Sequence, residues 1–329
     1  MSQTSVSSAK SMERHLKKIE KERIRKQKGK LIFNSGRDVP MYLLLLPAVL
    51  LLFVFNYIPI YGVIIAFKDY SPYKGVLASS WVGLKYFKYF LGDPTFWEVM
   101  RNTIVINLYN LIWGFPAPII FALLLNEVTR VRWKKTVQTI SYLPYFISWV
   151  VAAGLVASIL SPTTGVVNQI LSSVFHIEPV YFLTKKEYFR SIVVMADIWK
   201  GFGMGAVYYI ASITSIDQEQ YEAAIIDGAG RWKQTWYITL PGIANIIIVL
   251  FILRIGSMVT IGFENIFLLY NPVVYDVADV ISTYTYRLGI EGSQFSLTTA
   301  IGLTQSVVNF ALVYAANTIS RKVAGWSLW

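Results

Sequence analysis

The sequence predicts an all-α integral membrane protein with six transmembrane helices and with both termini in the cytoplasm. Of its 329 residues, 55% are hydrophobic, above the roughly 45–50% apolar share of soluble domains, and the mean hydropathy is +0.49. The apolar residues gather into runs long enough to cross a bilayer, which takes about 20 helical residues. Basic residues gather in segments that an even number of spans places on one side of the membrane.

Three parts are expected along the chain: a basic tail over residues 1–40, a transmembrane domain over 41–319 that contains a polar loop at 215–241, and a short C-terminal tail over 320–329. The first tail carries 11 of the 30 Lys and Arg residues. Such a tail is either a solvated segment that fixes the topology or a helix lying on anionic lipid.

The six spans are predicted from the apolar runs between polar segments. The first run, 27 residues long, exceeds the bilayer thickness, and Pro47 and Pro59 are expected to kink it. The aromatic-rich segment 68–97 is expected to form an ordered outer loop, and Gly165–Phe175 a small helix in the next one. The predicted spans are Met41–Phe67, Val99–Asn126, Thr136–Leu160, Arg190–Ile213, Gly242–Tyr270 and Leu297–Ile319.

Polar residues inside the spans are candidates for a path through the membrane, because such groups usually face protein or water rather than lipid. The alternative for each is a hydrogen bond between helices. Asp197 and Lys200, three residues apart, are expected to pair, and Gly201, Gly203 and Gly205 to allow close helix approach. The path candidates are Asn107, Asn110, Glu264, Asn265, Gln305 and Asn309.

The distribution of positive charge sets the predicted orientation. The segments assigned to the inner face hold 19 of the 30 Lys and Arg residues, whereas those assigned to the outer face, with Arg101 and Arg190, hold 9. Basic loops remain in the cytoplasm. Both termini and the polar loop at 215–241 are therefore predicted to be cytoplasmic.

Several kinds of chemistry are excluded by composition and motif. Cysteine is absent and the two histidines, His15 and His176, lie far apart, so no metal site and no cysteine or histidine catalysis is predicted. No G-x-x-x-x-G-K-[ST] loop is present to hold ATP phosphates. The net charge of +11 is largely local to the tail beside the membrane, which argues against a nucleic-acid partner. We expect neither an enzyme nor a chain that binds its own cofactor.

The polar loop has the features of a short amphipathic helix. Asp217, with Gln220 three residues later, is typical of a helix start, and Gly228 suits the left-handed position that ends one. Tyr221, Ala224 and Ile225 lie on one apolar face. An ordinary interfacial helix between two spans would share these features. Headgroup-level aromatic residues follow: Trp232, Trp236 and Tyr237.

The spacing within the loop is more specific. Glu222-Ala223-Ala224 is followed after three residues by Gly228, and after nine more by Ile238-Thr239-Leu240-Pro241. This pattern resembles the EAA signature of the membrane subunits of ATP-binding-cassette (ABC) importers. The resemblance implies that the loop is the coupling helix that docks on a separate ATPase. The implied docking residues are Tyr221, Glu222, Ala223, Ala224, Ile225, Asp227 and Gly228.

Residues Tyr142–Ala153 and the final stretch KVAGWSLW resemble the oligosaccharide branch of these permeases, which is related to the maltose system and includes alginate-type importers. The resemblance implies the type I importer fold in a bacterial inner membrane. The implied partners are a second permease, two cytoplasmic subunits that use ATP and Mg, an extracytoplasmic solute-binding protein, membrane lipid and an oligosaccharide.

Three alternatives differ from an oligosaccharide importer. An ion-coupled secondary carrier would need no ATPase and would normally show two repeated halves, of which these spans show none. A membrane scaffold would use the loop as a general docking site. An ABC permease for a non-sugar solute differs only along the spans.

Overall fold

The computed structural model describes residues 35–323, Gly325, Ser327 and Leu328. Of the basic tail predicted for residues 1–40, residues 1–34 lie outside the described residues. The chain divides into two units, Met1–Val63 and Ile64–Trp329.

The described part of the first unit is one apolar helical run. It consists of α2 (Ser35–Leu52), a π-helical turn (Phe53–Tyr57) and α3 (Ile58–Ile60), and a 3₁₀ stretch (Tyr61–Phe67) continues into the second unit. From Val39 to Phe67 the run is long and apolar enough to cross a membrane. The π turn directly precedes Pro59, where the missing N–H and the bulky ring prevent a regular α-helical hydrogen bond.

The predicted outer loop after this run is ordered by a small hairpin. Strand β1 (Lys68–Asp69) pairs antiparallel with β2 (Ser80–Trp81), with Lys68 opposite Trp81. The short helices α4 (Gly75–Ala78) and α5 (Lys85–Leu91) complete the segment. Phe90 at its end is fully buried and packs edge-on against Phe96 at 4.7 Å between ring centroids.

The second predicted span is a helical run over Pro94–Asn126. Helix α6 (Pro94–Tyr109) and helix α7 (Pro116–Asn126) are joined by a π-helical turn, Asn110–Gly114. The turn closes where Phe115 N–H donates to the Asn110 carbonyl at 2.9 Å. Pro116 cannot donate, so the wider turn accommodates the proline without ending the helix.

The third predicted span is not one helix. Helices α8 (Val131–Phe146) and α9 (Trp149–Ile159) meet at an angle of 103°. Pro144 weakens the last turn of α8, Ile147 and Ser148 are extended, and the Ser148 Oγ accepts from Val151 N–H to start α9. A local start signal therefore overrides an apolar composition that continues across the break.

Helix α11 (Lys186–Thr214) covers the fourth predicted span and follows α10 (Val166–Phe175), the small helix expected in this loop. It packs against α7 and α8. A Cβ at Gly203 would lie 2.0 Å from the Ser141 carbonyl oxygen. The close approach of α8 and α11 therefore requires glycine, as predicted.

The fifth predicted span is also broken. After the polar loop, which contains α12 (Gln218–Ile226) and α13 (Arg231–Gln234), the short α14 (Leu240–Gly242) leads into α15 (Ala244–Gly256). Residues 257–262 are not helical, and the helix resumes only as α16 (Phe263–Phe267). The break exposes backbone groups that need partners at membrane depth.

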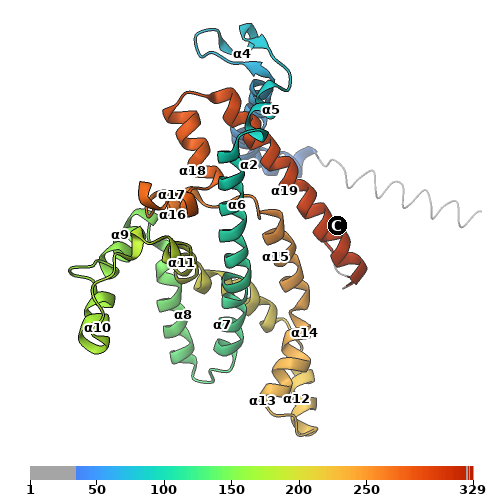
Figure 1. The fold of residues 1–329 in the computed structure, drawn as a ribbon. Helices are drawn as coiled ribbons and strands as arrows, with labels where there is room; N and C mark the ends of the chain where they lie inside the picture. The colour runs from blue at the N-terminus through green and yellow to red at the C-terminus, as the bar shows by residue number, and fades with distance from the viewer. Residues whose placement is uncertain (1–34, 324, 326, 329) are drawn as a thin grey trace, which may run out of the picture. The chain divides into compact units, whose positions relative to one another are not determined.

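The chain ends in α17 (Tyr275–Ala278), α18 (Ile281–Tyr286) and the long α19 (Phe295–Val323), which packs against α15. Within the second unit, Figure 1 shows α12 and α13 at the opposite end from α4 and α5. Among the described residues, three helical runs meet the length and composition of a span, or up to five if each bent pair is one span. Six spans therefore stay a prediction.

Candidate functional site

A polar cavity of about 400 Å³ lies inside the second unit. It is bounded by α6 and its π turn, by α9, by the middle of α11, and by the break between α15 and α16. This volume lies in the range of about 300–1,000 Å³ that is typical of small-molecule sites. The polar and aromatic groups that matter below are Asn107, Asn110, Trp149, Asp197, Arg254 and Asn265.

Asp197 is the acidic group of this cavity. The Asn265 side-chain amide donates to both of its carboxylate oxygens, at 3.0 and 3.1 Å, and the Asn110 amide donates to one of them at 3.1 Å. Both asparagines are almost fully buried. The π turn beginning at Asn110, helix α11 and helix α16 are therefore joined through one carboxylate.

Lys200 does not pair with Asp197, contrary to the sequence expectation. Its ammonium donates instead to the carbonyls of Pro144, Tyr145 and Ile147, at 3.4, 2.8 and 2.6 Å. These carbonyls lie at the 103° bend that follows α8, where regular helical hydrogen bonding stops and only the Pro144 carbonyl also accepts a backbone N–H, that of Ile147 at 3.3 Å. Lys200 therefore bonds to the break in the third span. The sequence pattern did not reveal this break.

Three of the six predicted path residues line the cavity and three do not. Asn107, Asn110 and Asn265 line it. Asn107 also donates to the carbonyls of Met258 and Thr260. Gln305 donates to the Val259 carbonyl, Asn309 donates to the Thr260 hydroxyl at 2.7 Å, and Glu264 is exposed on α16.

Residues 258–260 thus accept hydrogen bonds from side-chain amides of both α6 and α19. This is the interhelical hydrogen bonding that the sequence left open as an alternative, and it satisfies the backbone of the broken fifth span. Three further cavity residues, Trp149, Asp197 and Arg254, were not among the path candidates. A charged residue at membrane depth is the signal that could have added Arg254.

The helix α12 has the predicted start and end. The Asp217 carboxylate accepts from Glu219 N–H at 3.1 Å, whereas the Gln220 N–H, the donor of a capping box, bonds the Asp217 backbone carbonyl instead. Gly228 has φ +74°, the left-handed conformation that glycine adopts without strain. The Tyr221 hydroxyl and the Thr239 hydroxyl are 2.9 Å apart, so the helix is fixed to the following segment.

The outward surface of α12 includes two large apolar side chains among polar ones. The exposed fractions of Ile225 and Ile226 are 62% and 85%. Glu222, Ala223 and Asp227 are also exposed, whereas Tyr221 and Ala224 are half-buried. The predicted apolar face therefore divides, because Tyr221 and Ala224 turn inward and Ile225 turns outward.

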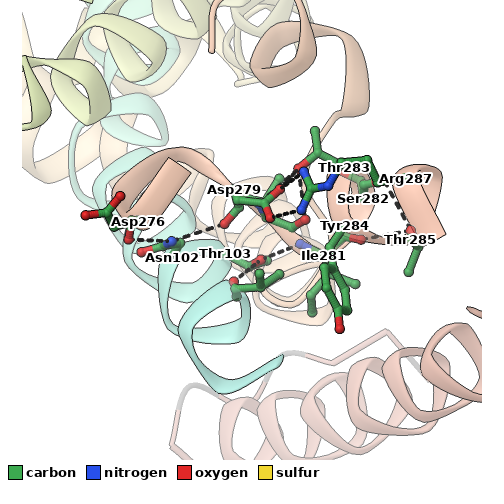
Figure 2. Close-up of polar contacts among 12 residues, drawn as sticks. Asn102, Thr103, Asp276, Asp279, Ile281, Ser282, Thr283, Tyr284, Thr285 and Arg287 are labelled. Carbon is green, nitrogen blue, oxygen red and sulfur yellow. Dashed lines mark hydrogen bonds and ion pairs between the residues drawn. The ribbon is translucent and has the colours of Figure 1, made fainter. Parts of the chain in front are cut away.

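A second polar cluster fixes the segment between α16 and α19 (Figure 2). Asp279, 5% exposed, forms a two-bond ion pair with Arg287, at 3.0 and 2.5 Å, and accepts from the Thr283 hydroxyl. The pairing with Asp279 raises the pKa of Arg287. Asn102 on α6 donates to the carbonyls of Asp276 and Asp279 and accepts from Arg190 on α11.

The fold and site define a membrane permease: broken helices surround a polar cavity, and a polar loop bears a short helix with two exposed isoleucines. Residues 114–325 match the family described as binding-protein-dependent transport system inner membrane component. The chain belongs to this family of ABC importer permeases.

The chain is similar over most of its length to curated proteins of Bacillus subtilis and to chains of solved ABC transporter structures. Protein LplB of Bacillus subtilis (strain 168) is 46% identical over 286 residues, which cover 87% of this chain and 90% of LplB. The polygalacturonan/rhamnogalacturonan transport system permease protein YteP of the same organism is 40% identical over 298 residues, covering 91% and 92%.

A chain in the crystal structure of a bacterial ABC transporter involved in the import of the acidic polysaccharide alginate matches with a TM-score of 0.81 and 42% identity, covering 89% of this chain and 99% of that chain. The structure of a bacterial alginate ABC transporter in complex with an alginate pentasaccharide-bound periplasmic protein matches with a TM-score of 0.80. The predicted type I importer permease fold and the membrane location are thereby confirmed.

Proposed function

We propose that this chain is one of two permease subunits of an ATP-driven importer, that it forms half of the path for an oligosaccharide, and that α12 transmits the movement of a partner ATPase. The observation that carries the proposal is the continuity of α11. This helix contributes Asp197 to the cavity and ends at Thr214, only four residues before α12 begins.

The exposed apolar face of α12 supports a docking role. Ile225 and Ile226 would lose contact with water in a cleft of a partner, and burial of such side chains contributes about 1.5–3 kcal/mol each. Glu222, exposed on the same short helix, adds a charge that fixes orientation. In this proposal ATP binding draws two such helices together, and hydrolysis releases them.

The substrate class follows from the relatives and the cavity together. YteP is named for polygalacturonan and rhamnogalacturonan, and the matched crystal structures are of alginate importers. In this chain the cavity combines hydrogen-bonding groups with Trp149, Phe115 and Phe202, the mixture of polar and aromatic surface that sugars require. A solute-binding protein, comparable to the periplasmic protein of the alginate complex, would deliver the oligosaccharide.

The test is purification of the chain from its native membrane in mild detergent. We expect a second permease and an ATPase to copurify and oligosaccharide to stimulate ATP hydrolysis. A double variant, Glu222→Lys with Gly228→Pro, should lose the ATPase but keep the second permease.

Gly230→Ala serves as the matched control, because Gly230 lies in the same loop at φ −68° with open space around its Cα. Recovery of the chain alone from active membranes, or retention of the ATPase by the double variant, would contradict the docking role.

A further inference from the structure

Arg254 is a cation at membrane depth whose side chain has no hydrogen-bond or ion-pair partner among the described residues. It lies near the end of α15 and lines the cavity. Its guanidinium is close enough to Asp197 for electrostatic attraction, yet it forms no hydrogen bond or ion pair with any residue that the structure describes. A guanidinium has five N–H donors, and those of Arg254, a partly buried residue of the cavity lining, are not among the enclosed unpaired atoms of the described residues, so they are open to a ligand.

Asp197 forms no ion pair with Arg254 among the described residues, although its carboxylate, which accepts three amide hydrogen bonds, keeps room for a further donor. Asn265 donates to both carboxylate oxygens and Asn110 to one. A two-bond Arg–carboxylate pair needs both oxygens facing the guanidinium. The nearby Asp197 carboxylate stabilises the charge of Arg254 electrostatically, while the N–H donors of Arg254 stay available.

The nearby lysine shows the opposite arrangement. Lys200 is three residues from Asp197 on α11, and its ammonium is occupied by three carbonyls at the bend between α8 and α9. Among the described residues that line the cavity, Arg254 is therefore the one cation.

We propose that Arg254 binds the carboxylate of a uronate unit and selects acidic over neutral oligosaccharides, an inference that rests on the proposed function. A carboxylate matches the planar guanidinium in a two-bond geometry. Trp149, Phe115 and Phe202 in the cavity wall face the apolar side of a sugar ring, and Asp197 can accept from its hydroxyls.

A single negative charge fits better than a double one. Among the described residues that line the cavity, Arg254 offers the one positive charge, and the Asp197 carboxyl lies nearby. A phosphate dianion would be opposed by Asp197 without a second cation to offset it. The cavity is thus suited to a monoanionic sugar unit.

The experiment measures equilibrium binding to the complete purified importer without its solute-binding protein, so that only the membrane site discriminates. The two probes are trigalacturonate and its fully methyl-esterified, neutral counterpart. We expect Arg254→Gln to weaken trigalacturonate binding by at least about tenfold and to change binding of the ester less than about twofold. Arg254→Lys, which keeps the charge but loses the planar fork, should lie between.

Arg132→Gln is the matched control, the same chemical change at an exposed position on α8 outside the cavity; it should leave both affinities unchanged. An equal loss for both probes in Arg254→Gln and Arg254→Lys would show a structural role and overturn the inference. Unchanged trigalacturonate binding in Arg254→Gln, or a wild type that binds only the ester, would also overturn it. A wild type that imports no oligosaccharide with its ATPases would instead refute the proposed function.

Discussion

Gly228 is the residue at which α12 has to stop. Its φ of +74° costs an L-residue roughly 1–2 kcal/mol, and proline cannot adopt it because its ring fixes φ near −65°. The chain turns here between the exposed isoleucines and α13.

We therefore expect Gly228→Pro to reduce oligosaccharide uptake at least about tenfold, while the amount of subunit in the membrane stays within about twofold of wild type. Uptake into proteoliposomes and quantitative immunoblotting measure the two quantities. Gly230→Ala should transport normally. Normal uptake by Gly228→Pro would remove the turn from the proposed coupling route.

Lys200 shows how one side chain completes a broken helix. Its ammonium donates to three carbonyls at the bend after α8, and a hydrogen bond from a charged group contributes about 1.5–3 kcal/mol. The ammonium also lies 5.5 Å from the centroid of the Trp149 ring, so it steadies a wall of the cavity.

Lys200→Met should lower the thermal unfolding midpoint of the detergent-solubilised importer and weaken oligosaccharide binding together, because the bend between α8 and α9 loses its donor. Lys200→Arg, which retains donors, should lose less. Circular dichroism and tryptophan fluorescence report the midpoint. An unchanged midpoint in Lys200→Met would mean that water replaces the ammonium without penalty.

At the scale of elements, two ion pairs that hold the segment after α16 differ in burial, one within the segment and one to Lys186 at the start of α11. Asp279 and Arg287 form a pair with side chains 8% and 29% exposed, whereas Lys186 and Asp276 are 48% and 59% exposed. Removing one partner of a buried pair typically costs about 3–5 kcal/mol, whereas exposed pairs contribute little because water screens them.

We expect Arg287→Ala to lower the unfolding midpoint strongly and Lys186→Ala hardly at all, under the same detergent conditions. The hydrogen bond from Lys186 lowers the pKa of Asp276, so the contribution of that pair is present above the ordinary carboxyl range and is lost as the pH falls through the lowered pKa. Equal midpoints for the two variants would contradict the burial argument.

The sequence predicted the elements better than their breaks. Long apolar runs located α6 with α7, α11 and α19, and Asp217 and Gly228 located the ends of α12. The breaks at Ile147–Ser148 and at 257–262 lie within apolar composition, so hydropathy did not reveal them.

The same limit applies to the site. Amides at membrane depth marked Asn107, Asn110 and Asn265 as candidates, but only the tertiary fold directs two of them to Asp197. It likewise turns Gln305 and Asn309 toward the backbone around 258–260.

For the whole molecule, the orientation is testable because the chain has no cysteine. Tyr73 is 100% exposed and Val131 is 65% exposed, and they lie on opposite predicted faces. A membrane-impermeant maleimide should label Tyr73→Cys in intact spheroplasts, and label Val131→Cys only after permeabilisation. The reverse pattern would invert the topology derived from the positive charges.

The exposed isoleucines of α12 also bear on how quickly the subunit is degraded before it assembles with its partners. Ile226, 85% exposed, is left largely uncovered by the part of the chain that the structure describes, and exposed apolar segments are what chaperones and proteases bind. In the proposed assembly, a copy synthesised without the ATPase would keep this apolar surface exposed. We expect these unassembled copies to be degraded faster than assembled ones. The amount of permease in the cell would then follow the amount of the proposed ATPase.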